Sequence, residues 1–321
     1  TPISFLSRTA DIYGERDAII YGDKVFNWNQ CLERCLRMAS SLSKKGIEEG
    51  DTVAVLAFNT PEMFEAHFSI PMAGGILNTI NTRLDFETIA YILDFGKVKG
   101  LFVDRELLPI AQKAIQKIKV KPFVIMIDDE NVEVKSPVEI DVLNYEELIS
   151  NGDPNYKINS IKDEWQALSL NYTSGTTGKP KGVVYHHRGS YLMSMGTVAG
   201  WSVPVHPRYL YCVPMFHCNG WGHAWTMTLM AATIICMRAF SPKLIFELLE
   251  KHKVTHFGGA PVVLNMLANA PTEEQKIFKR TINVMTAGAP PPPKVLESMT
   301  AFGFEVMHVY GLTETYGHIL Q

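Results

Sequence analysis

The first half of the chain repeats a unit that few folds can accommodate: a short apolar, β-branched run followed by a helix-like segment. Apolar residues of segment 30–45 recur at three- and four-residue spacing, which indicates a helix, and an apolar strand follows at 52–58. Further apolar runs at 76–80, 100–104 and 122–128 alternate with helical segments. Because strands joined by helices pair in parallel, the pattern predicts an α/β fold with parallel-rich sheets flanked by helices.

The composition of the chain changes between residues 128 and 165, which are polar and rich in turn-forming residues. We interpret this stretch as a surface excursion that ends a first subdomain. A strand at 166–172 then opens a second series of alternating strands and helices. The sequence therefore predicts two α/β subdomains, residues 1–165 and residues 166–321.

Charge and cysteine content exclude several classes of function. The 321 residues carry 30 Lys and Arg against 33 Asp and Glu, a net charge of −3. This balance lacks the cationic surplus of a nucleic-acid-binding protein. The five cysteines are odd in number and form no CxxC pair, so they indicate neither a disulfide framework nor a zinc site. A reducing, cytoplasmic location fits this pattern best.

Residues 209–237 contain no Lys, Arg, Asp or Glu, a length that raises the question of a membrane span. Pro214, His217 and Asn219 would leave polar groups and broken helical turns in hydrocarbon. We therefore expect strand, loop and buried helix here and no membrane span. Because the chain begins without Met and stops just after a motif, we also expect it to be a fragment of a longer protein.

A loop dense in glycine and hydroxyl residues follows the strand at 166–172. It reads YTSGTTGKPKG over residues 172–182. Glycines let backbone amides approach an anion, hydroxyls donate hydrogen bonds and lysines supply positive charge, so the loop predicts phosphate binding. It is not a Walker loop, since Pro180 follows Lys179 where that motif needs Ser or Thr. A plain solvent-exposed turn is the alternative.

This loop resembles the signature phosphate loop of the adenylate-forming superfamily, which includes acyl- and aryl-CoA synthetases, luciferases and peptide-synthetase adenylation domains. Three more motifs follow in the family's order: PMFHCNGW at 214–221, TAGAP at 286–290 and YGLTE at 310–314. The whole chain is similar to most of the large N-terminal domain of such an enzyme, with its C-terminal domain absent. MFHCNGW and YGLTETYG most resemble short- to medium-chain acyl-CoA synthetases, including methylmercaptopropionate-CoA ligases and plant acyl-activating enzymes.

The resemblance implies an AMP-forming acyl-CoA ligase that works in two half-reactions. A small-molecule carboxylate attacks the α-phosphorus of ATP in the presence of Mg²⁺, giving an acyl-adenylate and pyrophosphate. The thiol of CoA, the second co-substrate, then displaces AMP. A homodimer is consistent with the resemblance, although no interface can be read from the sequence.

The family's pattern also implies which residues surround the nucleotide. The β- and γ-phosphates would be bound by Thr173, Ser174, Gly175, Thr176, Thr177, Gly178 and Lys181. The adenine wall would consist of Gly288, Ala289, Pro290, Tyr310, Gly311 and Leu312. Thr313 would reach the α-phosphate, and Glu314 with Thr173 would hold Mg²⁺, which prefers hard oxygen ligands. The plainer alternatives are a helix-start acid for Glu314 and a core tyrosine for Tyr310.

The resemblance places the acyl pocket at His217, Cys218 and Trp221. No Asp or Glu occurs between residues 201 and 223, so an ammonium group would find no counter-ion there. A neutral, apolar substrate tail is therefore predicted, and an amino-acid-activating domain is disfavoured. We count Thr313, Glu314 and His217 as the predicted catalytic residues, with a core histidine as the alternative for His217.

Two other functions remain open from the sequence: an aryl-CoA ligase with a short, flat pocket, and a module that binds nucleotide without catalysis. The family's TGD motif, its hinge and its catalytic lysine lie outside this chain. We therefore expect the 321 residues alone to bind nucleotide weakly and not to adenylate at a useful rate.

Overall fold

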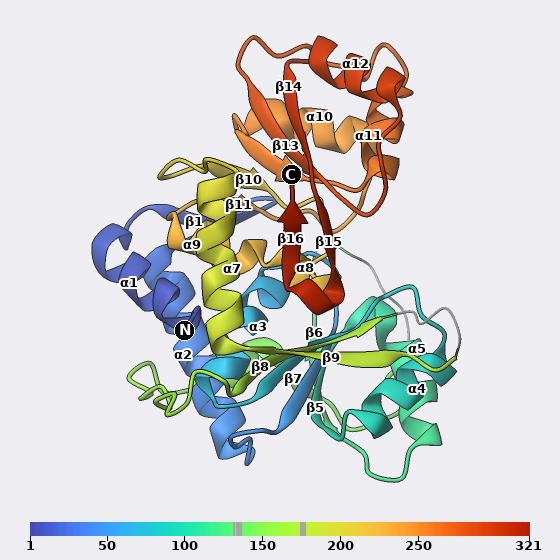
Figure 1. Ribbon diagram of the computed structural model, residues 1–321. Coiled ribbons are helices and arrows are strands. Elements are labelled where there is room, and N and C mark those ends of the chain that lie inside the picture. Colours follow the sequence, from blue (N-terminus) through green and yellow to red (C-terminus); the bar gives the residue numbers. More distant parts are fainter. Residues whose placement is uncertain (131, 133–136, 174–177) are drawn as a thin grey trace.

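The computed structural model describes residues 1–130, 132, 137–173 and 178–321. Four predicted phosphate ligands, Ser174, Gly175, Thr176 and Thr177, lie outside these residues. The described chain forms two large sheets, helices that cover them and a short two-stranded ribbon (Figure 1). The predicted α/β class, with parallel-rich sheets flanked by helices, is confirmed.

In the described residues, the first sheet has seven strands in the order β7-β6-β5-β3-β4-β8-β9. Neighbouring strands pair in parallel except β8 and β9, which are antiparallel. The strands are β3 (Thr52–Leu56), β4 (Ile76–Thr79), β5 (Val98–Asp104), β6 (Phe123–Ile127), β7 (Leu143–Asn144), β8 (Ala167–Thr173) and β9 (Lys181–His186).

Helices cover both faces of this sheet because its central strand is apolar on both sides. Val53 and Val55 of β3 pack into one core, and Ala54 and Leu56 pack into another. The first face is covered by α2 (Trp28–Lys44), α3 (Pro61–Met72) and α6 (Tyr145–Asn151), and the second by α4 (Phe86–Phe95) and α5 (Leu108–Lys117), which follows the 3₁₀ turn η1 (Arg105–Leu107).

The second sheet has, within the described chain, seven strands in the order β14-β13-β12-β10-β11-β1-β2. All its pairs are parallel except the edge pair β1–β2. The strands are β1 (Asp17–Tyr21), β2 (Lys24–Asn27), β10 (Arg208–Leu210), β11 (Thr233–Ile235), β12 (His256–Gly258), β13 (Ile282–Thr286) and β14 (Phe304–His308).

The remaining helices contact the second sheet or lie between the two sheets. They are α1 (Ile3–Tyr13), α7 (His187–Gly200), α8 (Cys218–Trp221), α9 (His223–Leu229), α10 (Pro242–Lys251), α11 (Pro261–Ala268) and α12 (Pro293–Ala301). The ribbon consists of β15 (Tyr310–Leu312), the 3₁₀ turn η2 (Thr313–Thr315) and β16 (Gly317–Leu320). Figure 1 shows it between β13–β14 and β8–β9, beside the long helix α7.

The two sheets exchange strands across the boundary predicted near residue 165. Strands β8 and β9 follow that point but extend the first sheet, whereas β1 and β2 precede it but belong to the second. One apolar core also runs through both sheets, with Ile19, Val53 and Ile234 among its members. The division into residues 1–165 and 166–321 therefore stays a prediction about subdomains, and the sheets do not follow it.

The polar stretch 128–165 contains more structure than its sequence suggests. Helix α6 begins after Asn144, whose side chain accepts a hydrogen bond from the backbone N–H of Glu147. Tyr145 and Ile149 are buried and pack into the core shared with α2. The expectation of a plain surface excursion is wrong for this segment, because two buried side chains dock a seven-residue helix.

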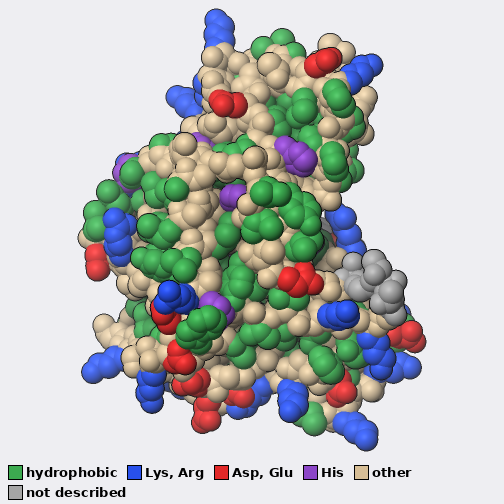
Figure 2. Space-filling model, in the orientation of Figure 1, with side chains coloured by type: hydrophobic (Ala, Val, Ile, Leu, Met, Phe, Trp, Pro, Cys, Tyr) green, Lys and Arg blue, Asp and Glu red, His purple; other side chains and the backbone are tan. Residues whose placement is uncertain are grey.

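The uncharged stretch 209–237 forms strand, turn and buried helix, as predicted: β10, α8, α9 and β11. In the part of the chain that the structure describes, no helix has the length and apolar character needed to cross a membrane. Figure 2 shows where apolar side chains reach the surface instead, over α7 and the β15–β16 ribbon. The exposed residues there include Leu192, Met195, Leu312, Ile319 and Leu320.

Candidate functional site

A cavity of about 810 Å³ lies where loops from both sheets meet. Its walls come from residues that follow β3, β4, β10 and β13, together with the β15–β16 ribbon and α11. Parallel strands end at one edge of a sheet, and ligands of open α/β folds bind at that edge. Three of the four sequence motifs, 214–221, 286–290 and 310–314, contribute residues to this cavity.

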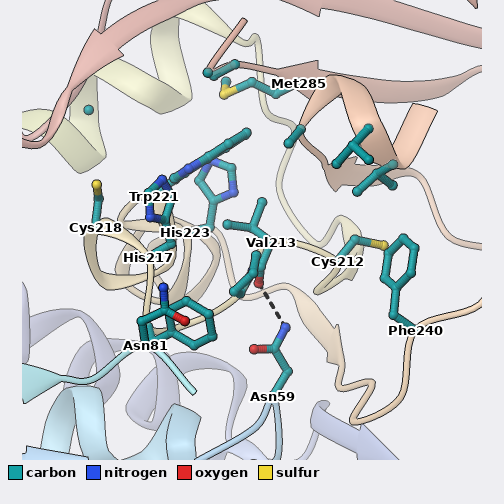
Figure 3. A pocket seen from close by; sticks show the side chains of 18 of the residues that line it. Asn59, Asn81, Cys212, Val213, His217, Cys218, Trp221, His223, Phe240 and Met285 are labelled. Carbon is teal, nitrogen blue, oxygen red and sulfur yellow. Dashed lines mark hydrogen bonds between the residues drawn. The ribbon is translucent and has the colours of Figure 1, made fainter. Parts of the chain in front are cut away.

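The three predicted acyl-pocket residues all line the cavity: His217, Cys218 and Trp221. Figure 3 shows their side chains together on the turn that contains α8. Cys218 Sγ lies 3.1 Å from Thr313 Oγ1, so this turn meets the first residue of η2. The structure thus brings the second and fourth motifs of the sequence into contact.

Burial is the main cause of the pKa shifts of the titratable side chains on this side of the cavity. Burial lowers the pKa of His217, which favours a neutral imidazole in the cavity. Burial also raises the pKa of the Cys218 thiol, an environment that disfavours the thiolate. His223, which also lines the cavity, is buried and its pKa is lowered to about 3. Its Nδ1 lies 2.6 Å from Tyr209 Oη.

The charged side chains among the described lining residues of the cavity are arginines. The described residues that line it include no Asp or Glu, so an ammonium group has no carboxylate partner there. Two arginines line it, and one of them, Arg83, is exposed. The other is Arg238, and Asp104 Oδ1 and Glu106 Oε2 accept hydrogen bonds from its Nη2 at 2.8 and 2.9 Å. Its guanidinium also lies 4.4 Å from the ring centroid of Phe58. This arginine is therefore neutralised by the protein itself.

Asn59 is a cavity residue that the sequence analysis missed. It follows β3 of the first sheet, and its Nδ2 donates to the carbonyl oxygens of Tyr211 and Val213, both at 2.8 Å. Figure 3 shows the bond to Val213. Its Oδ1 accepts from the backbone N–H of Met215 at 2.8 Å. One side chain thus fixes the segment that leads into the turn of residues 218–222, which carries predicted acyl-pocket residues and is called the acyl turn below. The missed signal was its position just after a buried strand, where functional loops of such sheets lie.

The predicted adenine wall divides into two parts. Gly288, Gly311 and Leu312 line the cavity. Among the described lining residues, Ala289, Pro290 and Tyr310 do not occur. Gly288 has φ 95° and open space where a Cβ would stand. Tyr310 is 51% exposed, so its interpretation as a core tyrosine is wrong.

The catalytic residues predicted in YGLTE lie in η2, next to β9 and the acyl turn. The carbonyl oxygen of Thr313 accepts a hydrogen bond from Tyr185 Oη at 2.6 Å. Thr313 also lines the cavity. Glu314 is exposed, and its charge is among the causes that raise the pKa of Tyr185 and of Cys218. These contacts place η2 between β9, which follows the predicted phosphate loop, and the acyl turn.

Of the predicted phosphate ligands, Thr173, Gly178 and Lys181 are described. Thr173 ends β8 and pairs with Lys181 at the start of β9, while Gly178 and Lys181 are exposed. The described residues hold no group of three or more His, Cys, Asp or Glu arranged for a metal. A hydroxyl and one carboxylate still fit Mg²⁺, because this ion takes hard oxygen ligands and usually only one or two from protein beside substrate phosphates.

Loops that surround one cavity at the strand ends are the arrangement in which open α/β domains bind ligands, and a comparison with known families assigns the chain to one of them. Residues 6–321 match the family described as AMP-binding enzyme. The chain belongs to that family, and the predicted recognition of the adenylate-forming fold is confirmed.

Named relatives extend this finding. A peroxisomal acetate/butyrate–CoA ligase of Arabidopsis thaliana is 42% identical over 99% of this chain and 58% of its own length. A 2-methylpropanoate–CoA ligase of Humulus lupulus is 45% identical over 100% of this chain and 58% of its own length. The N-terminal domain of FACL13 from Mycobacterium tuberculosis has a TM-score of 0.84 at 23% identity, over 98% of this chain and 77% of that one. The chain thus spans 58% of the length of these two curated relatives.

Proposed function

We propose that this chain is the N-terminal, nucleotide- and acyl-binding part of an AMP-forming acyl-CoA ligase. The substrate would be a short- to medium-chain alkanoate or a methylthio-alkanoate. Two relatives named as ligases of acetate, butyrate and 2-methylpropanoate support the short end of this range. Family membership over residues 6–321 supports ATP as the nucleotide.

The observation that carries the proposal is the cavity itself. Its acyl side holds a neutral imidazole, a thiol and an indole, and its described lining residues include no Asp or Glu. An apolar tail can therefore lie against these three side chains, and the carboxylate end can lie toward Thr313. Gly288 lies on the other side, where open space in place of a side chain leaves room for a purine, and Gly311 lines the same cavity.

In the proposed first half-reaction, a carboxylate oxygen bonds to the α-phosphorus of ATP and the bond to the pyrophosphate oxygen breaks. Thr313 is the residue proposed to donate a hydrogen bond to the α-phosphate, and Lys181 and Gly178 would contact the β- and γ-phosphates. Mg²⁺, held by Glu314 and Thr173, would neutralise phosphate charge. In the second half-reaction the sulfur of CoA bonds to the acyl carbon, and AMP leaves with the electron pair of the broken bond.

Location and assembly belong to the same proposal. We infer a cytoplasmic enzyme from the cysteine pattern, and a peroxisomal location, as in the name of the Arabidopsis relative, is the alternative. A fluorescent fusion of the complete gene product, imaged beside a peroxisomal marker, decides between them. A homodimer is also part of the proposal, and sedimentation of the purified protein tests it.

The decisive assay measures pyrophosphate release and acyl-CoA formation by the complete gene product. Acetate, butyrate, hexanoate and 3-methylthiopropionate are the test acids, with benzoate as the aryl alternative and an acid-free reaction as the background. We expect turnover with at least one alkanoate and none with benzoate. Turnover with benzoate alone would support an aryl-CoA ligase, and nucleotide binding with no turnover would support a binding module.

A further inference from the structure

The turn that carries the predicted acyl-pocket residues has an unusual backbone. Cys218, Asn219, Gly220, Trp221 and Gly222 all have positive φ, between 41° and 71°. Left-handed backbone is unfavourable for residues with a Cβ atom, and asparagine tolerates it better than most. A run of such residues keeps its shape only where the surrounding structure holds it.

Asn219 is the residue of this turn with the most anchoring bonds. Its side chain is fully buried, and Oδ1 accepts from Ser169 Oγ at 2.5 Å and Asn171 Nδ2 at 2.6 Å. Its Nδ2 donates to Thr79 Oγ1 at 3.0 Å, and that hydroxyl donates to the carbonyl of Phe216. Its backbone N–H donates to Asn171 Oδ1 at 2.8 Å. Both the oxygen and the nitrogen of the side-chain amide have partners, which favours one arrangement of the turn.

The anchors of Asn219 connect the turn to the strand that enters the predicted phosphate loop. Ser169 and Asn171 lie on β8, and alternate residues of a strand share a face, so Thr173 lies on that face two residues further. At the other end of the contact, Cys218 Sγ meets Thr313 Oγ1 at 3.1 Å. The buried amide therefore ties the acyl turn to the element that leads to the phosphates.

We propose that Asn219 is a positioning residue that sets the place of the acyl turn, residues 218–222, against β8. It would thereby set how the enzyme discriminates between carboxylates of different length. Asn219 is not among the described residues that line the cavity, whereas its neighbours Cys218 and Trp221 line it. Asn219 would therefore act through these two residues. This inference rests on the proposed function of the same cavity.

A simpler explanation is that position 219 needs only a residue that tolerates φ 41°. Two substitutions separate these roles. Asn219→Gly removes the amide but accepts positive φ without strain, whereas Asn219→Ala removes the amide and keeps the strain. If backbone tolerance were the whole role, N219G would behave like wild type. If the hydrogen bonds position the turn, both variants change.

The matched control is Asn78→Ala. Asn78 is also a fully buried amide of the first sheet, next to Thr79 on β4, and its Nδ2 donates to the carbonyl of Leu170 at 2.9 Å. Its removal should lower the melting temperature without moving the acyl turn. Any general effect of losing a buried amide near β8 therefore appears in N78A as well.

The first measurement is the ratio of kcat/KM for hexanoate to kcat/KM for acetate in the complete gene product. We expect N219A and N219G to change this ratio about tenfold, the scale on which a pocket senses single methylenes. The KM for ATP should stay within about twofold, and N78A should keep the wild-type ratio. An unchanged ratio in N219A, or a wild-type ratio in N219G, would overturn the proposal.

The second measurement needs no catalytic activity. Cys218 is partly exposed, whereas Cys31, Cys35, Cys212 and Cys236 are buried, so a thiol reagent reports on the acyl turn. Mass spectrometry should show Cys218 alkylated about tenfold faster in N219A and N219G than in wild type and N78A, because loss of the anchors opens the turn. Equal rates in all four proteins would contradict the anchor. If wild type activates no carboxylate, the proposed function fails, and this experiment still decides the role of Asn219.

Discussion

The two walls of the cavity are held in different ways. The proposed acyl wall, residues 211–222, is fixed by the amide of Asn59, which reaches it from the first sheet. It is also fixed by the amide of Asn219, which belongs to the wall and bonds to Asn171 of β8. In the proposed nucleotide wall, residues 310–314, Tyr310 is 51% exposed and Leu312 is 50% exposed. A pocket that selects an apolar tail must keep its shape and exclude water, whereas a nucleotide enters from solvent. Substitutions behind the acyl wall should therefore change stability and selectivity, and those in the nucleotide wall should change kinetics alone.

The largest expected effect is at Arg238, a cavity residue paired with the buried Asp104 at the end of β5. Arg238→Met leaves the buried Asp104 without its guanidinium, so we expect the free energy of unfolding to fall by about 3–5 kcal/mol. Urea unfolding at pH 7 measures it. Arg188→Met is the control, because its pair with Glu164 is exposed on both sides and should contribute less than about 1 kcal/mol. Equal losses in both variants would refute the assigned difference in burial.

A substitution at Glu314 tests the proposed nucleotide wall. Glu314→Gln keeps the size of the side chain but removes the charge proposed to hold Mg²⁺. The rate of pyrophosphate release in the presence of a carboxylic acid substrate should therefore fall about 100- to 1000-fold. The melting temperature should not change, since this side chain is exposed. Glu305→Gln, at an exposed position of β14, is the control. Wild-type turnover in E314Q would remove Glu314 from the proposed site.

The sequence predicted the parts of this arrangement that local pattern and motif determine. Alternating strands and helices predicted the α/β class, and motif order predicted that His217 and Thr313 belong to one site, where Cys218 Sγ and Thr313 Oγ1 now meet. Nothing local predicts that β1 and β2 join the second sheet or that Asn59 binds Tyr211 and Val213. Those pairings join residues more than 150 positions apart and depend on how the two sheets pack.

Helix α3, which follows Asn59, contains a buried carboxyl group, Glu62, that should make the stability of this region depend on pH. Burial, and then the charge of Glu65, raises the pKa of Glu62 from 4.5 to about 7. The folded state then binds this proton more tightly than the unfolded chain, so the contribution of Glu62 to stability is full below pH 4.5 and is lost as pH rises toward 7.

Glu62→Gln removes this loss. We expect the variant to exceed wild type by about 2–3 kcal/mol in unfolding free energy at pH 8 and by little at pH 4.5. Urea unfolding at both values measures the difference. Glu297→Gln, at an exposed position of α12, should show no such change with pH. A pH-independent gap between E62Q and wild type would mean that Glu62 is ionised alike in both states.

The smallest expected effect is at Tyr310 in the nucleotide wall. If its ring stacks on adenine, Tyr310→Ala should raise the KM for ATP about tenfold, because stacking of a base on an aromatic side chain contributes about 1–3 kcal/mol. Tyr310→Phe keeps the ring and should stay within about twofold of wild type. Neither variant should unfold earlier, since half of this side chain already faces solvent. An unchanged KM in Y310A would move the purine toward Gly288, where open space replaces a side chain and where the adenine contacts would then lie.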